Sequence, residues 1–172
     1  MKPKNLVFLN PFTIENPSRE QQTDFLYGDM MVSSALGKLG KVYDYRELPK
    51  TEEELKVFID GKIIEDKPQW VVATDLSASV LAGIKIPNRI LINPHISFDD
   101  LNNVPEHTRQ TTHGFFDESH ESDYERFCSV YPSAMLSLAP EMDYDRIAPI
   151  IEGIISQKED LNYSYFSMGN VR

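Results

Sequence analysis

The carboxylate of Asp75 stands in a sequence pattern that is typical of a catalytic or ligand-binding position. Asp75 lies within Gln69–Ala82, which has the pattern of a short buried strand, a tight turn and a helix of small and apolar residues. Such a turn places the side chain at its apex above the carboxyl edge of a sheet, facing the first turn of the helix. Small residues, Ala73 and Ser77, stand two positions before and two after Asp75, as close strand–helix packing requires. An aspartate at this apex can serve as an acid, a base or a nucleophile that attacks carbon.

A base to work with this carboxylate would come from one of four histidines. His95 follows the apolar run Arg89–Ile92, a predicted strand beside the strand that leads to Asp75, so its ring is expected near the same sheet edge. An Asp75–His95 pair is therefore a candidate for acid–base chemistry, and a loop histidine bonded to backbone or solvent is the alternative. The other three are expected at the surface, and their spacings of six and seven residues fit no common zinc motif: His107, His113 and His120.

A shifted reading puts a serine at the centre of the same stretch. In Asp75–Ser79 the central residue is Ser77, which would be the nucleophile if the strand continued for two more residues. This reading places Asp75 where such turns normally carry glycine. The alternative is that Ser77 and Ser79 are small residues that let the helix pack closely. No metal-ligand cluster and no cofactor motif is found elsewhere, so neither a metal nor a cofactor is expected.

Strand-like apolar runs alternate with helical patterns along the chain. Thr51, followed by Glu54, forms a capping box that predicts the start of a helix, and Asp145 is expected to cap a later one. The order predicts an α/β fold in one domain spanning 1–172, a mostly parallel open sheet with helices on both faces in a three-layer sandwich. The predicted strands are 5–9, 41–48, 69–74, 89–92, 133–138 and 162–168, and a helix is predicted to end at Gly40 after apolar residues at Phe25, Val32, Leu36 and Leu39.

One long stretch lacks a clear period. Residues 97–119 are polar and irregular in pattern, with Asp99, Asp100 and Gly114 among them. A segment of this length in a compact domain is typical of a functional excursion or lid, or of a partly disordered stretch.

Composition narrows the function classes. The 172 residues carry a formal net charge of −10, which argues against nucleic acid or an anionic membrane as partner, because both need clustered Lys and Arg. With 41% hydrophobic and 26% charged residues the chain has the composition of a globular domain. The single cysteine, Cys128, fits a reducing compartment, and no apolar run has the length of a membrane span, so a cytoplasmic location is expected. A small-molecule ligand and a homo-oligomer both remain compatible with these numbers.

Three stretches, in order, resemble the α/β-hydrolase superfamily over nearly the whole chain. They are Leu9–Phe12, in place of the His-Gly-aromatic stretch after the first strand; Val72–Ala78, in place of Gly-x-Ser-x-Gly-Gly; and Ile90–Pro94, similar to the strand after the elbow helix. The sequence is similar to small single-domain esterases with a Gly-Ser-Ser-Leu-Gly-Gly elbow. Through Val42–Leu48 and Ile96–Pro105 it also resembles the pimeloyl-carrier-protein methyl ester esterases.

The resemblance implies a role for several residues. It places the nucleophile at Asp75 and one oxyanion N–H each at Phe12 and Leu76. It places the acid at Glu141 or Asp143. The family's histidine follows the last strand, where this chain has Met-Gly-Asn-Val-Arg and no histidine.

Three functions are therefore compatible with the sequence. A degenerate hydrolase, which binds a small ligand or a partner in the old pocket without turnover, is favoured because serine, histidine and flanking glycines are all replaced. An active small esterase or hydrolase would use Asp75 or Ser77 with His95. A non-catalytic interaction or oligomerisation protein would use the 97–119 segment as its contact.

Overall fold

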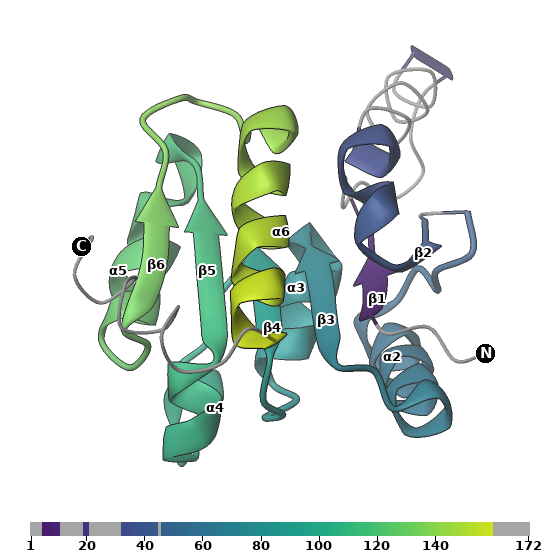
Figure 1. Ribbon diagram of the computed structural model, residues 1–172, viewed down its shortest axis with the longest axis horizontal. Helices are drawn as coiled ribbons and strands as arrows, with labels where there is room; N and C mark the ends of the chain where they lie inside the picture. The colour runs from purple at the N-terminus through teal and green to yellow at the C-terminus, as the bar shows by residue number, and fades with distance from the viewer. Residues whose placement is uncertain (1–4, 11–18, 21–31, 45, 160–172) are drawn as a thin grey trace.

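Six parallel strands form one open sheet in the computed structural model, which describes residues 5–10, 19–20, 32–44 and 46–159 (Figure 1). The strand order is β2-β1-β3-β4-β5-β6, and every neighbouring pair is parallel. The chain thus steps from β1 outward to β2, returns to β3 on the other side of β1, and continues to the far edge. The strands are β1 (Asn5–Phe8), β2 (Lys41–Tyr43), β3 (Trp70–Thr74), β4 (Arg89–Ile92), β5 (Thr112–Phe116) and β6 (Ser133–Leu136).

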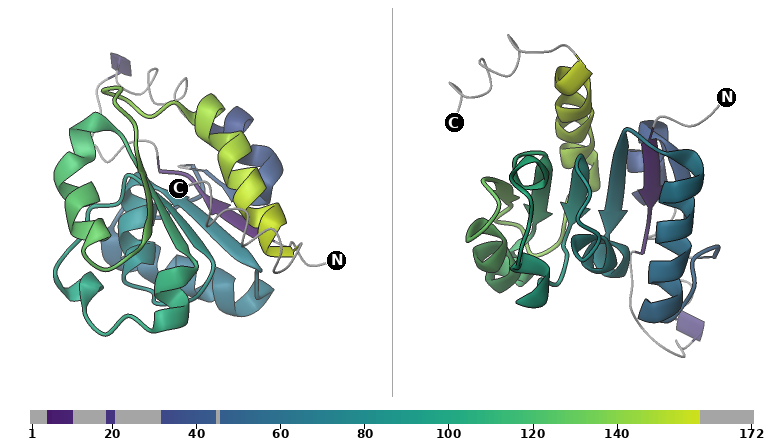
Figure 2. Two further views of the ribbon diagram at one scale, coloured as in Figure 1. Left: turned by 60° about the vertical axis from the view of Figure 1, so that its left-hand side comes forward. Right: turned by 90° about the horizontal axis from the view of Figure 1, so that it is seen from below.

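Helices cover both faces of this sheet, which gives the expected three layers (Figure 2). On one face lie α2 (Glu52–Asp66), α3 (Asp75–Ala82) and α5 (Glu121–Cys128). On the other lie the helical residues 32–36 and α6 (Tyr144–Glu159). Short helical segments complete the described chain: η1 (Gly37–Leu39), η2 (Asp99–Leu101), α4 (Glu106–Gln110) and η3 (Glu118–His120). Within the described ranges, no helix has the length and apolar character needed to cross a bilayer.

The two cores follow from the two-residue period of the central strand. In β3, Val71 and Ala73 join the cluster under α2, α3 and α5, whereas Trp70 and Val72 join the cluster under α6. All five residues of β3 are buried. A strand covered on both faces needs apolar residues at every position, which is why this segment is a continuous apolar run.

Most predicted elements are confirmed, with shifted ends. Thr51 caps α2 as expected, because its Oγ1 accepts a hydrogen bond from the Glu54 N–H at 3.2 Å. The strand predicted over 41–48 ends at Tyr43. The helix predicted to be capped by Asp145 is capped instead by Asp143, whose Oδ1 accepts from the Arg146 N–H at 3.2 Å. The strand predicted at 162–168 and the residue Phe25 lie outside the described residues.

The prediction that residues 97–119 are irregular is wrong. This stretch contains η2, α4 and the whole of β5, which pairs with β4 and β6 in the interior of the sheet. The strand is hard to recognise in the sequence because His113 and Gly114 interrupt its apolar run. A Cβ at Gly114 would lie 2.8 Å from the Phe127 ring, so packing against α5 requires glycine in this strand.

A buried arginine anchors the helix that follows β3. Arg89, at the start of β4, is fully buried and donates to the carbonyls of Leu81, Ala82 and Ile84 at 2.9, 3.2 and 3.0 Å. It also donates to the Tyr131 hydroxyl at 2.8 Å. These bonds satisfy carbonyls at the C-terminal end of α3, where a positive charge is favourable. Arg89 therefore fixes one end of the helix whose other end carries Asp75.

Candidate functional site at the carboxyl edge of the sheet

Asp75 lies at the apex of a sharp strand–helix turn, where the sequence places it. β3 ends at Thr74, α3 begins at Asp75, and the apex residue has φ 49°. A positive φ is uncommon outside glycine and costs of order 1 kcal/mol or more, so the surroundings must hold it. The strand order reverses next to this point, between β1 and β3. In open α/β sheets, ligands bind at the carboxyl ends of the strands beside such a reversal.

The turn is held by polar contacts with the end of β1. The Asn10 N–H donates to Thr74 Oγ1 at 2.8 Å. The Ser77 hydroxyl donates to Asn10 Oδ1, so both sides of the apex are tied to the same asparagine. Ser77 has no exposed surface and lies inside α3. The prediction that Ser77 could be a nucleophile is therefore wrong, because a substrate cannot reach its hydroxyl.

Beside this turn, a second carboxylate is surrounded by hydrogen-bond donors. Asp117, which follows β5, accepts from Asn93 Nδ2 at 2.9 Å, from Ser119 Oγ at 2.6 Å and from His120 Nδ1 at 2.8 Å. Its own N–H donates to Asn93 Oδ1 at 3.0 Å. Asn93, directly after β4, has a left-handed conformation, with φ 52°. We call Asn93, Asp117, Ser119 and His120 the Asp117 cluster.

The donors of this cluster keep Asp117 ionised. Burial by itself raises the pKa of Asp117, but the hydrogen bonds from His120, Ser119 and Asn93 outweigh it, and the pKa lies below its ordinary value. The carboxylate in turn orients the imidazole. With Nδ1–H directed at Asp117, Nε2 of His120 is left as an acceptor, and it has no partner among the described residues. The His120 side chain is 32% exposed, so a small molecule can reach it.

Asp75 has the opposite electrostatic environment. Burial raises its pKa well above the ordinary value, and the nearby negative charge of Asp117 raises it further. Its carboxyl group thus keeps its proton to a higher pH than an exposed aspartate does. The protonated form can donate a hydrogen bond and is a poorer nucleophile than the carboxylate.

A tyrosine completes the group at this edge. Tyr144, the first residue of α6, is partly buried, and burial raises its pKa well above the usual value. The charges of Asp75 and Asp117 add to this increase, so the three side chains are close enough to interact electrostatically. Figure 1 shows α6 beginning at the end of the sheet to which the strand arrows point.

His95 does not pair with Asp75, so this prediction is wrong. Its Nδ1 lies 3.2 Å from Asp123 Oδ1, on α5, and its side chain is 75% exposed. Its backbone N–H donates to the Ser79 hydroxyl at 2.7 Å, one turn along α3 from Asp75. The ring is therefore directed toward α5, because Asp123 offers an acceptor there. The histidine that pairs with a carboxylate at the end of β5 is His120, on Asp117, although the sequence places His120 at the surface.

The remaining predicted residues have separate outcomes. Glu141 is exposed, and Asp143 is an exposed helix cap; neither orients a histidine in the described structure. Leu76 lies in the first turn of α3, directly after the apex, and is partly buried. Phe12 lies outside the described residues.

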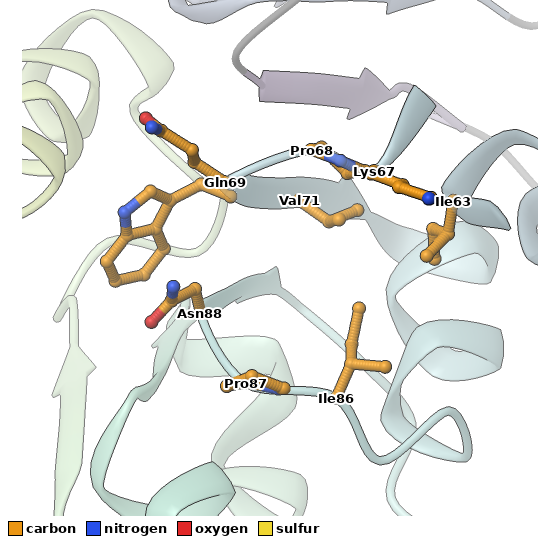
Figure 3. A pocket seen from close by; sticks show the side chains of 9 residues that line it. Ile63, Lys67, Pro68, Gln69, Val71, Ile86, Pro87 and Asn88 are labelled. Atoms are coloured by element: carbon orange, nitrogen blue, oxygen red, sulfur yellow. The ribbon is translucent and has the colours of Figure 1, made fainter. Parts of the chain in front are cut away.

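Two cavities lie apart from Asp75 and the Asp117 cluster. The larger, of 520 Å³, is at the amino ends of β3 and β4, the opposite end of the sheet (Figure 3). Lys67 and Ile63 lie at one end of it and Asn88 at the other, and its lining contains no carboxylate and no histidine. A smaller cavity of 270 Å³ is lined by Leu76, Ser79, His95 and neighbours from α2. The larger space is therefore not where the predicted chemistry lies. In the parts of the chain that the structure describes, no group of acidic, histidine or cysteine side chains can hold a metal ion.

Comparison with known proteins does not assign the chain to a family. No protein-family model matches it, and no curated protein matches it.

Proposed function

We propose that this chain is a degenerate member of the α/β-hydrolase fold that binds a small ligand at the carboxyl edge of its sheet and carries out no serine-type acyl transfer. One observation carries the proposal. A left-handed strand–helix turn of the kind that presents a nucleophile in such folds lies here at φ 49°, and it carries Asp75, whose pKa burial raises.

The surroundings support binding at this edge. Polar side chains from four successive strand ends converge there: Asn10 after β1, Asp75 after β3, Asn93 after β4 and Asp117 after β5. Keeping a non-glycine residue at positive φ and burying its carboxyl both cost free energy. Such costs concentrate at functional sites, where binding depends on a preset geometry.

The proposal is tested by ligand titration with ¹⁵N-labelled protein. Small polar fragments should shift the backbone amides of Leu76, Asn93 and His120. Asp75→Asn should weaken these shifts, whereas Asp145→Asn, an exposed change on α6, should not. A fluorophosphonate probe should leave the chain unlabelled. Labelling, or fragment shifts spread over other surfaces alone, contradicts the proposal.

A hydrolase with Asp75 as nucleophile is the second candidate. The Asp117–His120 hydrogen bond favours it, because an oriented imidazole can activate the water that releases an alkyl-enzyme ester. The raised pKa of Asp75 argues against it. Intact-mass spectra after treatment with an alkyl halide or epoxide distinguish the two: an adduct on Asp75 in the wild type that vanishes in Asp75→Asn supports the nucleophile.

A further inference from the structure

The larger cavity lies at the amino ends of β3 and β4, where two connecting segments face each other (Figure 3). Segment 67–69 leads from α2 into β3, and segment 86–88 leads into β4. Val71 and Arg89 are neighbours across these two strands, so the segments that precede them lie side by side. We call the 520 Å³ space that they line the amino-edge cavity. Natural small-molecule sites have volumes of about 300–1,000 Å³, so this space can hold a small ligand.

The walls of the amino-edge cavity are held in fixed conformations. Each segment contains a proline, which restricts its backbone. Lys67 and Asn88 have left-handed backbones, with φ 47° and 61°. The Lys67 N–H donates to the Ile63 carbonyl at 2.9 Å, and the Asn88 N–H donates to Thr111 Oγ1 at 3.0 Å. A ligand therefore meets a preformed surface, and left-handed residues other than glycine are concentrated at functional sites.

One end of the cavity carries a positive charge. Lys67 is the single charged residue among those that line it. Its ammonium forms no ion pair with a carboxylate of the described residues, so it can pair with an anion from solution. The nearby C-terminal end of α2 has partial negative charge, so the ammonium must supply the attraction for such an anion.

The opposite end carries a hydrogen-bonding group. Asn88 lies there, and Figure 3 shows Val71 and Ile86 between it and the end with Lys67. The side-chain oxygen of Asn88 is buried and has no hydrogen-bond partner among the described residues. A buried acceptor without a partner costs free energy, which a donor on a ligand can recover.

From this arrangement we infer that the amino-edge cavity binds a small hydroxy acid, in which an apolar body separates the carboxylate from the hydroxyl. The carboxylate pairs with the Lys67 ammonium, the body packs against Val71 and Ile86, and the hydroxyl donates to Asn88 Oδ1. This is a second site, at the other end of the sheet from the ligand site proposed above, and it does not depend on that proposal.

The test uses 4-hydroxyphenylacetate, whose ring separates a carboxylate from a hydroxyl. Trp70 is the only tryptophan in the sequence and lines the cavity, so its fluorescence reports binding. The probe should change this fluorescence to saturation and shift the backbone amides of Trp70, Val71 and Asn88. The neutral 4-hydroxyphenylacetamide should bind about fivefold more weakly, which corresponds to about 1 kcal/mol for one exposed ion pair. Absence of a saturable change, or equal affinity for the acid and the amide, overturns the inference.

Variants test the two ends separately. Lys67→Met should lower the affinity for the acid to that for the amide, and Lys67→Arg should restore it. Lys38→Met, at an exposed lysine in η1, is the matched control and should bind as the wild type does. Asn88→Gly, which adopts the left-handed backbone without strain, should remove the preference for 4-hydroxyphenylacetate over phenylacetate. An affinity for the acid that is unchanged in Lys67→Met, or a preference that is unchanged in Asn88→Gly, overturns the role of that residue and with it the assigned ligand class.

Spectra of ¹⁵N-labelled protein separate this inference from the proposed function. Shifts at Trp70, Val71 and Asn88 report the amino-edge cavity, whereas shifts at Leu76 and His120 report the carboxyl edge. If 4-hydroxyphenylacetate shifts only amides at the carboxyl edge, the inference fails and the proposed function stands.

Discussion

Replacing Arg89 by methionine tests whether the anchor at the far end of α3 holds the site in place. The guanidinium is fully buried and forms no ion pair with a carboxylate of the described residues; its donors go to carbonyls and hydroxyls. Burial lowers the pKa of Arg89, although an arginine remains charged at any ordinary pH. Methionine keeps an unbranched apolar stem and removes every donor.

The expected loss follows from the groups left without partners. The carbonyls of Leu81 and Ile84 also accept backbone N–H groups, from Ile84 and Ile86, so each keeps one bond. The Ala82 carbonyl and the Tyr131 hydroxyl lose the partner that Arg89 provides. Two orphaned buried groups cost about 2–6 kcal/mol together. Relief from burying a cation reduces this sum, so we expect a loss of about 3 kcal/mol.

Thermal unfolding measures the change. For a chain of this length each kcal/mol shifts Tm by about 2–4 °C, so Arg89→Met should unfold about 6–12 °C below the wild type. Arg146→Met, on the exposed side of α6, is the control and should stay within about 0.5 kcal/mol of the wild type. Equal melting temperatures for Arg89→Met and the wild type would refute the view that Arg89 anchors α3.

Three further changes test the apex, the cluster and the helix cap. The pKa of Asp75 in the folded protein lies above its ordinary value of 3.8, so the wild type loses stability as pH rises from 3.8 through the folded pKa. Asp75→Asn should remove this loss. The Tm of Asp75→Asn relative to the wild type should therefore rise between about pH 3.5 and about pH 8. In urea unfolding, the free energy of unfolding of Asn93→Gly should exceed that of Asn93→Ala by about 1 kcal/mol, because only the alanine is strained at φ 52°. Thr51→Ala should cost about 1 kcal/mol in urea unfolding through the lost bond to Glu54, and an unchanged midpoint would contradict the cap.

The local features of this fold are those that the sequence predicts. The run at 70–74, the bend at Asp75 and the cap at Thr51 each depend on residues within a few positions of one another. The sheet follows from the alternation of such segments, since successive parallel strands need crossover connections.

The features that the sequence does not predict depend on distant residues. β5 contains a glycine because the Phe127 ring, from α5, fills the space where a Cβ would lie, and glycine is normally depleted in strands. Without that strand, no pattern places Asp117 and His120 at the carboxyl edge. The only local signal is the spacing of an aspartate and a histidine three residues later, after a buried strand. The sequence does not indicate the partner of His95 for the same reason, since Asp123 comes from α5.

The opposite behaviour of Asp75 and Asp117 gives the sharpest test of the site. Asp117 has three side-chain donors and stays ionised, and its charge then helps to keep the proton on Asp75. Asp117→Asn removes that charge while its side-chain oxygen can still accept from Asn93, so the pKa of Asp75 should fall and that of Tyr144 should fall with it. Carbon-13 NMR of the Asp75 carboxyl over a pH titration measures the change. Desolvation, the larger cause, remains, so the pKa of Asp75 should stay above 3.8. An unchanged titration of Asp75 would mean that the two carboxyls do not interact, and the argument that Asp117 helps to keep the proton on Asp75 would fail.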